Sequence, residues 1–434
     1  MPLDTRSADA RVALGRTRPE HDAAAAIAAR PLPRDRRLVA LLAAAVFISY
    51  IDRTNISVGA LAMQQRFGWS ETQKGSVLAA FYVGYLPLMI ASGAIANRYG
   101  GRIVLGVAVL WWSVFTALTP AAALVSLPAL LMARGALGLG EAAVFPASFN
   151  LIGAHIPGAL RSRAVAWVTS SAALGTVFAL FASGWMVRAY GWPVPFYAFG
   201  AVGVGWAVLW WVAECDRLLT ARSPSSAQVT IPWRELLRAR PIWAIVAAHF
   251  CYNWCSYVLL AWMPSYFKSA FGVTVAGAGM LSAAPWVAVF LTANLAGHLA
   301  DQAIRRGAAV IVVRKLAQVT GLVGAGVFLI MLSAAHSLPS AVILMCAATG
   351  FLGFCQAGFA PNCLDIAPRH SDVVYGLSNT VATLPGLFGV FVTGWLIDRT
   401  GSFAGSFYAT ACVAWAGALV YAGLAADTPS RGLA

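Results

Sequence analysis

Long apolar runs, separated by short connectors that are charged or contain Gly and Pro, dominate the pattern of this chain. A run of about 20 apolar residues is long enough to cross the hydrocarbon core of a bilayer as an α-helix. The pattern therefore predicts an all-α polytopic membrane protein with twelve transmembrane helices. The predicted helices start near Leu38, Gly75, Ile103, Leu127, Ala164, Pro195, Pro241, Val275, Val312, Pro339, Val374 and Phe403.

The positions of the cations explain the high net charge. Of 434 residues, 60% are hydrophobic and 11% charged, yet the formal net charge is +14. The connectors on the side of the N-terminus hold 14 Lys and Arg residues and the opposite connectors hold five, while the N-terminal tail adds eight. This asymmetry follows the positive-inside rule. We therefore expect both termini in the cytoplasm, a location in the plasma (cell inner) membrane, and no nucleic-acid partner.

The second half of the chain repeats the first. The segment Gly138–Ala142 followed by Pro146 recurs with the same internal spacing as Gly353–Ala357 followed by Pro361, and the tripeptide at Ser183 recurs in similar form at Thr393. Many secondary transporters consist of such repeats around a central site, so we predict two pseudo-symmetric six-helix halves. The predicted regions are a cytoplasmic N-terminal tail at 1–37, a first half at 38–214, a cytoplasmic linker at 215–240, a second half at 241–425 and a cytoplasmic C-terminal tail at 426–434.

Charged side chains inside the predicted helices of the first half are the candidate chemistry. An intramembrane charge usually faces the bundle interior and marks an ion or substrate path. Arg134 and Glu141 are seven residues apart, about two helical turns, so they share one helix face. Arg53 lies at a depth similar to that of Arg134, and two guanidiniums at one level suit a carboxylate or phosphate. The alternative is that Arg134 is a structural partner of Asp52 or Glu141.

The repeat is imperfect at a titratable position. Glu141 corresponds to Gln356 in the second half, so only the first half can carry a proton there. We expect Glu141 to be the main proton-coupling residue, because no cation lies within one turn of it on its own helix, and Asp52 to be the second candidate. Tyr252 and Asn253 are candidates for the polar wall of a substrate site in the second half. Packing and helix–helix hydrogen bonding explain these two residues at least as well.

Several segments together resemble one known family. The residues that carry the resemblance are Asp52–Ser57, Phe81–Tyr85, Gly93–Arg102, Arg134–Pro146, Ile231–Trp233, His249–Trp254, Ala300–Asp301, Val313–Lys315 and Asp365–Arg369. With them the chain resembles the major facilitator superfamily, and within it the anion:cation symporter group. That group includes sialin, the vesicular glutamate transporters, type I sodium/phosphate cotransporters, plant plastid anion transporters and bacterial sugar-acid permeases.

The resemblance implies roles for individual residues. Arg53 would engage the substrate anion, Glu141 would couple protons, and Arg134 would be linked to that coupling. A cytoplasmic gate would form from three further residues, Arg98, Arg102 and Asp301.

The chain departs from the family pattern at two of these places. Asn97 stands where the superfamily usually has Asp, which weakens the implied gate. Tyr252 stands where the vesicular glutamate transporters have a substrate-binding arginine, which argues against a dianion such as glutamate.

We therefore expect a secondary active transporter that carries a small anion, an organic acid or phosphate, in symport with H⁺. The alternatives are Na⁺-coupled phosphate transport and a drug/proton antiporter of the same fold, although the fifth predicted helix lacks the Gly-Pro ending typical of such antiporters. We expect no enzyme activity, because no nucleophile–base set is apparent. We also expect no metal site and no cofactor, and a monomer in the bilayer.

Overall fold

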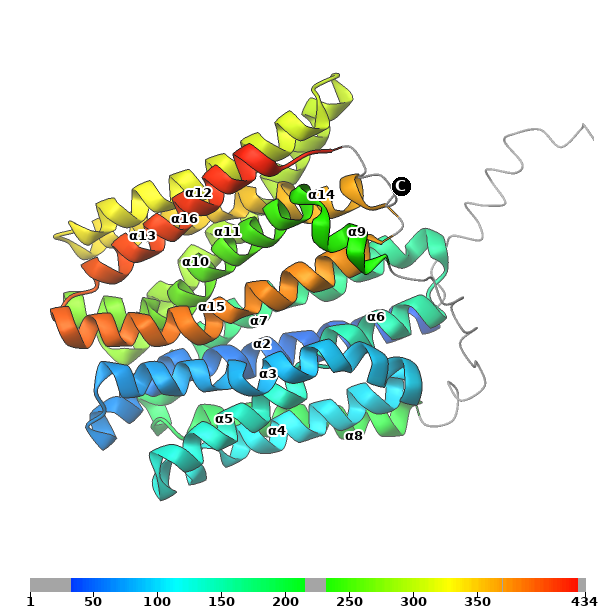
Figure 1. Ribbon diagram of the computed structural model, residues 1–434. Coiled ribbons are helices and arrows are strands. Elements are labelled where there is room, and N and C mark those ends of the chain that lie inside the picture. Colours follow the sequence, from blue (N-terminus) through cyan, green and yellow to red (C-terminus); the bar gives the residue numbers. More distant parts are fainter. Residues whose placement is uncertain (1–32, 215–231, 369, 428–434) are drawn as a thin grey trace, which may run out of the picture.

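Helices and the short connectors between them make up the described chain. Figure 1 shows the computed structural model, which describes residues 33–214, 232–368 and 370–427 and contains no strand in these ranges. The helices are α2 (Pro33–Phe67), α3 (Glu71–Tyr99), α4 (Gly101–Val125), α5 (Leu127–Glu141), α6 (Val144–His155), α7 (Gly158–Tyr190), α8 (Val194–Glu214), α9 (Trp233–Arg238), α10 (Arg240–Phe271), α11 (Val275–Arg305), α12 (Val310–Ser333), α13 (Leu338–Phe354), η2 (Cys355–Ala357), α14 (Phe359–Ile366), α15 (Ser371–Thr400) and α16 (Ala404–Leu424).

The helices confirm the predicted membrane architecture. Within the described ranges, 11 helical segments are long and apolar enough to span a bilayer, and the count is 12 when α3 is taken as one bent span. Two of these spans are composite: α5 and α6 form one of them, and α13, η2 and α14 form another. The observed starts at Leu127 and Val275 coincide with the predicted ones.

Some predicted boundaries fall elsewhere. Helix α2 begins at Pro33, inside the predicted N-terminal tail, with Asp35 in its first turn, where an acidic residue stabilises the helix dipole. The rest of that tail, residues 215–231 of the linker and residues 428–434 lie outside the described residues. The described part of the linker contains the short helix α9.

The helices form two groups that follow the chain order. Helices α2 to α8 form the first half and α10 to α16 the second, and the two halves lie side by side in Figure 1. The halves meet where α3 packs on α15, α7 on α11 and α2 on α10. We call the end of the bundle that carries Pro33 and Asp427 the tail end, and the end that carries Phe67 and Thr400 the distal end.

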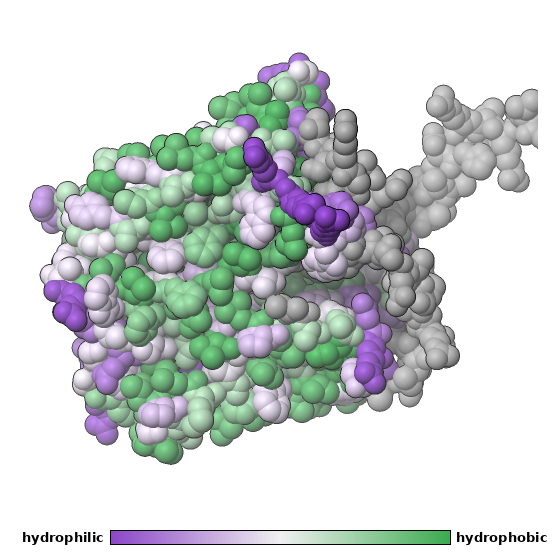
Figure 2. All heavy atoms as spheres, in the orientation of Figure 1, coloured by the Kyte–Doolittle hydropathy of each residue, from purple (hydrophilic) through white to green (hydrophobic). Residues whose placement is uncertain are grey.

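The outer surface matches a bilayer environment. Large apolar side chains such as Leu124, Trp167 and Leu291 are exposed along the flanks of the bundle, and Figure 2 shows hydrophobic residues over most of the visible flank with hydrophilic ones gathered toward the two ends. Because backbone groups in hydrocarbon must be hydrogen-bonded internally, an all-helical bundle suits this apolar exterior. The chain is a multi-pass membrane protein.

Candidate functional site between the halves

Glycines bring α5 into very close contact with its neighbour α3. A Cβ atom at Gly138 would overlap the carbonyl oxygen of Phe81, and one at Gly84 would overlap that of Gly135. Small residues allow transmembrane helices to approach this closely. The packing fixes the depth and rotation of α5, and with them the positions of its charged side chains.

The span that contains α5 breaks at its acidic residue. Helix α5 ends at Glu141 and α6 begins at Val144. Pro146 lacks the N–H that would continue the helical hydrogen bonding across this point. The second half breaks at the matching position, because Gln356 lies in η2, five residues before Pro361. Broken helices at matching positions of two repeats often mark the binding site of a secondary transporter.

Glu141 pairs with Arg53 of α2 at this break. The Nη2 and Nε atoms of Arg53 donate to Oε2 of Glu141 at 3.0 and 3.2 Å, and the Ser49 hydroxyl donates to the same oxygen at 2.9 Å. Both charged residues are buried, with 7% of Arg53 and none of Glu141 exposed. The sequence places no cation within one turn of Glu141 on its own helix, and the structure shows that its cationic partner, Arg53, comes from another helix.

Aromatic rings surround the guanidinium of Arg53. Its central carbon lies 4.9 Å from the ring centroid of Tyr50, 4.6 Å from that of Phe81 and 4.8 Å from that of Tyr85. The guanidinium of Arg134 approaches the same Phe81 ring at 5.8 Å. The ring of Phe81 is therefore shared by the two guanidiniums.

Arg134 and Asp52 are also buried, but they are not paired with each other. Nε and Nη1 of Arg134 and both carboxyl oxygens of Asp52 have no hydrogen-bond partner, and no ion pair joins the two residues in the described part of the chain. Asp52 faces α4, where Thr116 and Trp112 are close to its carboxyl group. A buried charge without a close partner is costly, so both side chains are candidates for contact with an ion or water, and Arg134, which lines the pocket, also for contact with a ligand.

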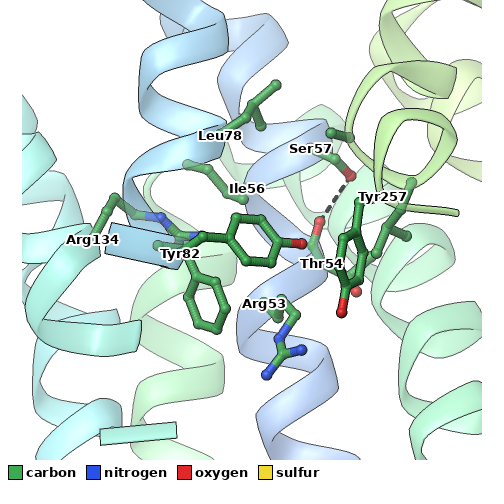
Figure 3. A pocket seen from close by; sticks show the side chains of 11 residues that line it. Arg53, Thr54, Ile56, Ser57, Leu78, Tyr82, Arg134 and Tyr257 are labelled. Carbon is green, nitrogen blue, oxygen red and sulfur yellow. Dashed lines mark hydrogen bonds between the residues drawn. The ribbon is translucent and has the colours of Figure 1, made fainter. Parts of the chain in front are cut away.

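A small pocket between the halves brings both arginines together. Figure 3 shows the side chains of Arg53 and Arg134 with the rings of Tyr82 and Tyr257, which come from different halves and lie 5.0 Å apart between centroids. The lining residues are Arg53, Thr54, Ile56, Ser57, Leu78, Phe81, Tyr82, Arg134, Tyr257, Leu260 and Ala261. The pocket is cationic on the side of the first half and aromatic and apolar on the side of the second.

The second half has a neutral counterpart of the ion pair. Gln356, the repeat partner of Glu141, donates from Nε2 to the Tyr252 hydroxyl at 2.8 Å. Asn253 donates from Nδ2 to the carbonyl of Ala382 at 2.8 Å and to the Tyr257 hydroxyl at 3.4 Å. The amide nitrogen of Asn253 thus holds α10 against α15, and its Oδ1 atom is the part left for another partner.

The three residues of the implied gate form no ion pair with one another in the described part of the chain. Arg98 lies over the ring of Tyr99 at 5.5 Å, Asp301 is exposed, and no ion pair joins Asp301 to Arg98 or Arg102 in the residues that the structure describes. Asn97 accepts a hydrogen bond from Asn150 within the first half instead. The latch that the resemblance implies is therefore not formed as an ion pair in this conformation of the described residues.

Sequence reasoning missed the partners of Arg53. Ser49 precedes it by one helical turn, a spacing that puts both side chains on one face of α2. The aromatic residues Phe81 and Tyr85 are four apart and so also share a face. These spacings could have indicated an aromatic cage, but nothing in them could assign it to Arg53.

Comparison with known proteins identifies relatives along most of the chain. The family model for the Major Facilitator Superfamily matches residues 42–390. The chain is 36% identical over 381 residues to "Probable anion transporter 4, chloroplastic" of Oryza sativa, covering 85% of this chain and 64% of that protein. Two proteins of Arabidopsis thaliana are similar: the chloroplastic ascorbate transporter (36% identity, covering 90% of this chain and 74% of that protein) and the chloroplastic sodium-dependent phosphate transport protein 1 (37%, 85% and 74%). The chain thus spans about two thirds to three quarters of the length of these relatives.

A solved structure has the same fold. A bacterial homolog of the human lysosomal transporter Spinster, in an inward-facing and occupied conformation, aligns with a TM-score of 0.75 over 90% of this chain and 96% of that one. Because the sequence identity is only 19%, this similarity shows a shared fold and nothing more.

Proposed function

Because this chain belongs to the Major Facilitator Superfamily, we propose that it is a secondary active transporter that moves a small anion, an organic acid or phosphate, across the membrane in symport with H⁺. Like its relatives, the chain is a transporter and not an enzyme. Relatives that carry ascorbate and phosphate support a small anion as the substrate class.

The buried pair of Arg53 and Glu141 carries the proposal. Glu141 occupies the donor atoms of Arg53 that a substrate carboxylate or phosphate would use. A buried cation that loses its counter-charge is strongly destabilised, by about 3–5 kcal/mol. The carboxylate of Glu141 and an incoming anion are therefore alternative partners for one guanidinium.

This competition couples the anion to a proton. When Glu141 takes up a proton, it no longer supplies a negative charge, and Arg53 is left to attract the anion. When the anion leaves, Arg53 regains its counter-charge only if Glu141 loses its proton. Proton and anion thus occupy the site together and leave it together, which is the requirement for symport.

Arg134 provides the second positive charge. Its guanidinium lines the same pocket and has two nitrogens without a hydrogen-bond partner. A carboxylate or phosphate between the two guanidiniums would accept hydrogen bonds from both. Asp52, close to Thr116 and Trp112 of α4, is the second proposed proton-binding residue.

The coupling ion has one alternative. A relative named as a sodium-dependent phosphate transport protein favours Na⁺-coupled phosphate transport as the second candidate function. Reconstituted protein distinguishes the two: uptake driven by a pH gradient without Na⁺ supports the H⁺ proposal, and uptake that requires an inward Na⁺ gradient contradicts it.

We propose that both tails are cytoplasmic in a plasma (cell inner) membrane and that the transporter works as a monomer. The excess of Lys and Arg in the connectors at the tail end supports this orientation. Protease cleavage of a tag added before Met1 in inverted vesicles, with protection in intact cells, is the expected result. The opposite pattern would reverse the orientation.

The substrate can be found by thermal stabilisation of purified protein with a library of ascorbate, sugar acids, other monocarboxylates and phosphate. A bound ligand raises the unfolding temperature by mass action. Anions that stabilise the protein, and do so less in the variant Arg53→Ala, support the proposal. Stabilisation only by hydrophobic cations would favour the antiporter alternative.

A further inference from the structure

At the distal end of the bundle, an acidic residue of the second half caps a helix of the first half. Asp398 near the end of α15 accepts hydrogen bonds from the backbone N–H groups of Glu71 (2.9 Å) and Thr72 (2.7 Å) and from the Thr72 hydroxyl. These N–H groups open α3 and have no partner within their own helix. A carboxylate is stabilised there by both the hydrogen bonds and the helix dipole.

A buried lysine reinforces the contact. The Nζ atom of Lys74 lies 2.6 Å from Glu71 Oε2 and donates to Gln64 Oε1 at 2.8 Å. Only 1% of Lys74 is exposed, and Nζ lies 4.9 Å from the ring centroid of Trp262, which belongs to α10 of the second half. The cation is therefore enclosed at the boundary between the halves.

Glycines let the backbones of α3 and α15 meet beside this network. A Cβ atom at Gly394 would overlap the carbonyl oxygen of Glu71, and one at Gly75 would lie 3.2 Å from Trp262. The repeat has the matching contact, where a Cβ at Gly184 would lie 2.9 Å from the carbonyl oxygen of Ala276 at the start of α11. Each half therefore contributes one glycine to a close contact between the halves at the distal end.

The two contacts differ in charge. Asp398 follows Gly394 by four residues, and the residue four positions after Gly184 is the exposed Arg188. An acid suits the N-terminus of a helix and a cation does not. Only the contact between α15 and α3 can therefore be locked in this way.

We propose that Asp398, supported by the Lys74 network, is the latch that holds the distal entrance of the transporter closed, and that it must release α3 each time the site opens to that side. The proposal rests on the proposed function to the extent that it assumes alternating access. When the latch opens, water replaces Asp398 at the start of α3 and hydrates the freed carboxylate, so the contact is reversible. Loss of the acid therefore favours the distal-open state.

The test measures access to the pocket from the distal side and needs no substrate. The parent protein has serine in place of all seven native cysteines and carries Ser57→Cys, because Ser57 lines the pocket and is buried. A membrane-impermeant maleimide is added to intact cells. A second parent with Ser402→Cys in place of Ser57→Cys, exposed at the distal end, calibrates access from that side.

We expect Asp398→Ala to increase the labelling rate at Ser57→Cys on the order of tenfold, since it removes hydrogen bonds to a charged group. Asp398→Asn keeps one acceptor oxygen and should give an intermediate rate; it also serves as the test if the alanine variant does not fold. Arg188→Ala at the matching position is the control and should leave the rate unchanged.

Labelling of folded Asp398→Asn or Asp398→Ala at the parental rate would overturn the proposal, as would an equal increase in Arg188→Ala. Because labelling needs neither anion nor H⁺ gradient, this outcome is separate from a failure of the proposed transport function.

Discussion

Glu141→Gln tests the competition between an anion and residue 141 for Arg53. The substitution keeps the shape and the acceptor oxygen of the side chain but removes its charge. Arg53 donates two hydrogen bonds to Glu141, at 3.0 and 3.2 Å. Hydrogen bonds to charged groups contribute about 1.5–3 kcal/mol each, roughly twice the value for neutral groups.

The structure gives the size of the effect. With the lower value for each bond, weakening both by about half removes roughly 1.5 kcal/mol of stabilisation from the internal pair. An anion that replaces residue 141 at Arg53 no longer has to overcome that energy. We expect it to bind Glu141→Gln about tenfold more tightly than the wild type at neutral pH.

The pH dependence follows from the same exchange. In the wild type the anion binds together with a proton, so its affinity should rise as pH falls and approach that of the glutamine variant. In Glu141→Gln the affinity should not change with pH. Uphill uptake driven by a pH gradient should be lost, while binding and exchange of substrate across the membrane remain.

The assays are thermal stabilisation by the anion across a pH series, and uptake in proteoliposomes with and without an imposed pH gradient. Ser49→Ala is the matched control, because it removes one hydrogen bond to Glu141 but leaves the carboxyl group. If the glutamine variant still concentrates substrate with unchanged pH dependence, this reasoning is refuted. Asp52 or a sodium site must then provide the coupling.

Three further predictions concern Arg53, the glycine packing of α5 and Asp301. Arg53→Ala should abolish uptake. Arg53→Lys should nearly abolish it, because an ammonium lacks the planar fork that donates two parallel hydrogen bonds. Near-wild-type uptake by the alanine variant would contradict the role of Arg53. Gly138→Ala should lower the unfolding temperature, since its Cβ would overlap the Phe81 carbonyl. Gly153→Ala is the control and should be neutral, because a Cβ there has open space. Equal unfolding temperatures of the two variants would count against the packing argument. Asp301→Asn should increase the reactivity of pocket cysteines from the tail side if Asp301 closes that end, and unchanged reactivity would exclude it from the gate.

The membrane architecture could be read from the sequence because its cause is local. Each span needs its own apolar run, and the runs that begin at Leu127 and Val275 gave starts that the structure reproduces. The common face of Arg134 and Glu141 also follows from helical spacing alone.

The partners of these charges could not be read in the same way. The pair of Arg53 and Glu141 depends on how α2 is rotated against α5, and the glycine contact of α5 with α3 sets part of that arrangement. Asn253 looked like a candidate wall of the site, but its amide nitrogen is used between α10 and α15. The contact of Asp398 with Glu71 joins residues 327 positions apart, which no local pattern reveals.

Proton uptake that accompanies anion binding is the most direct test of the central claim. Purified protein in weak buffer with a pH indicator dye is mixed with the anion identified by thermal stabilisation, at a pH where uptake is half-maximal. We expect net proton uptake by the wild type on binding, up to about one per anion, and none by Glu141→Gln, because anion and proton replace the internal ion pair together. Anion binding to the wild type without proton uptake, or equal uptake by Glu141→Gln, would contradict the claim.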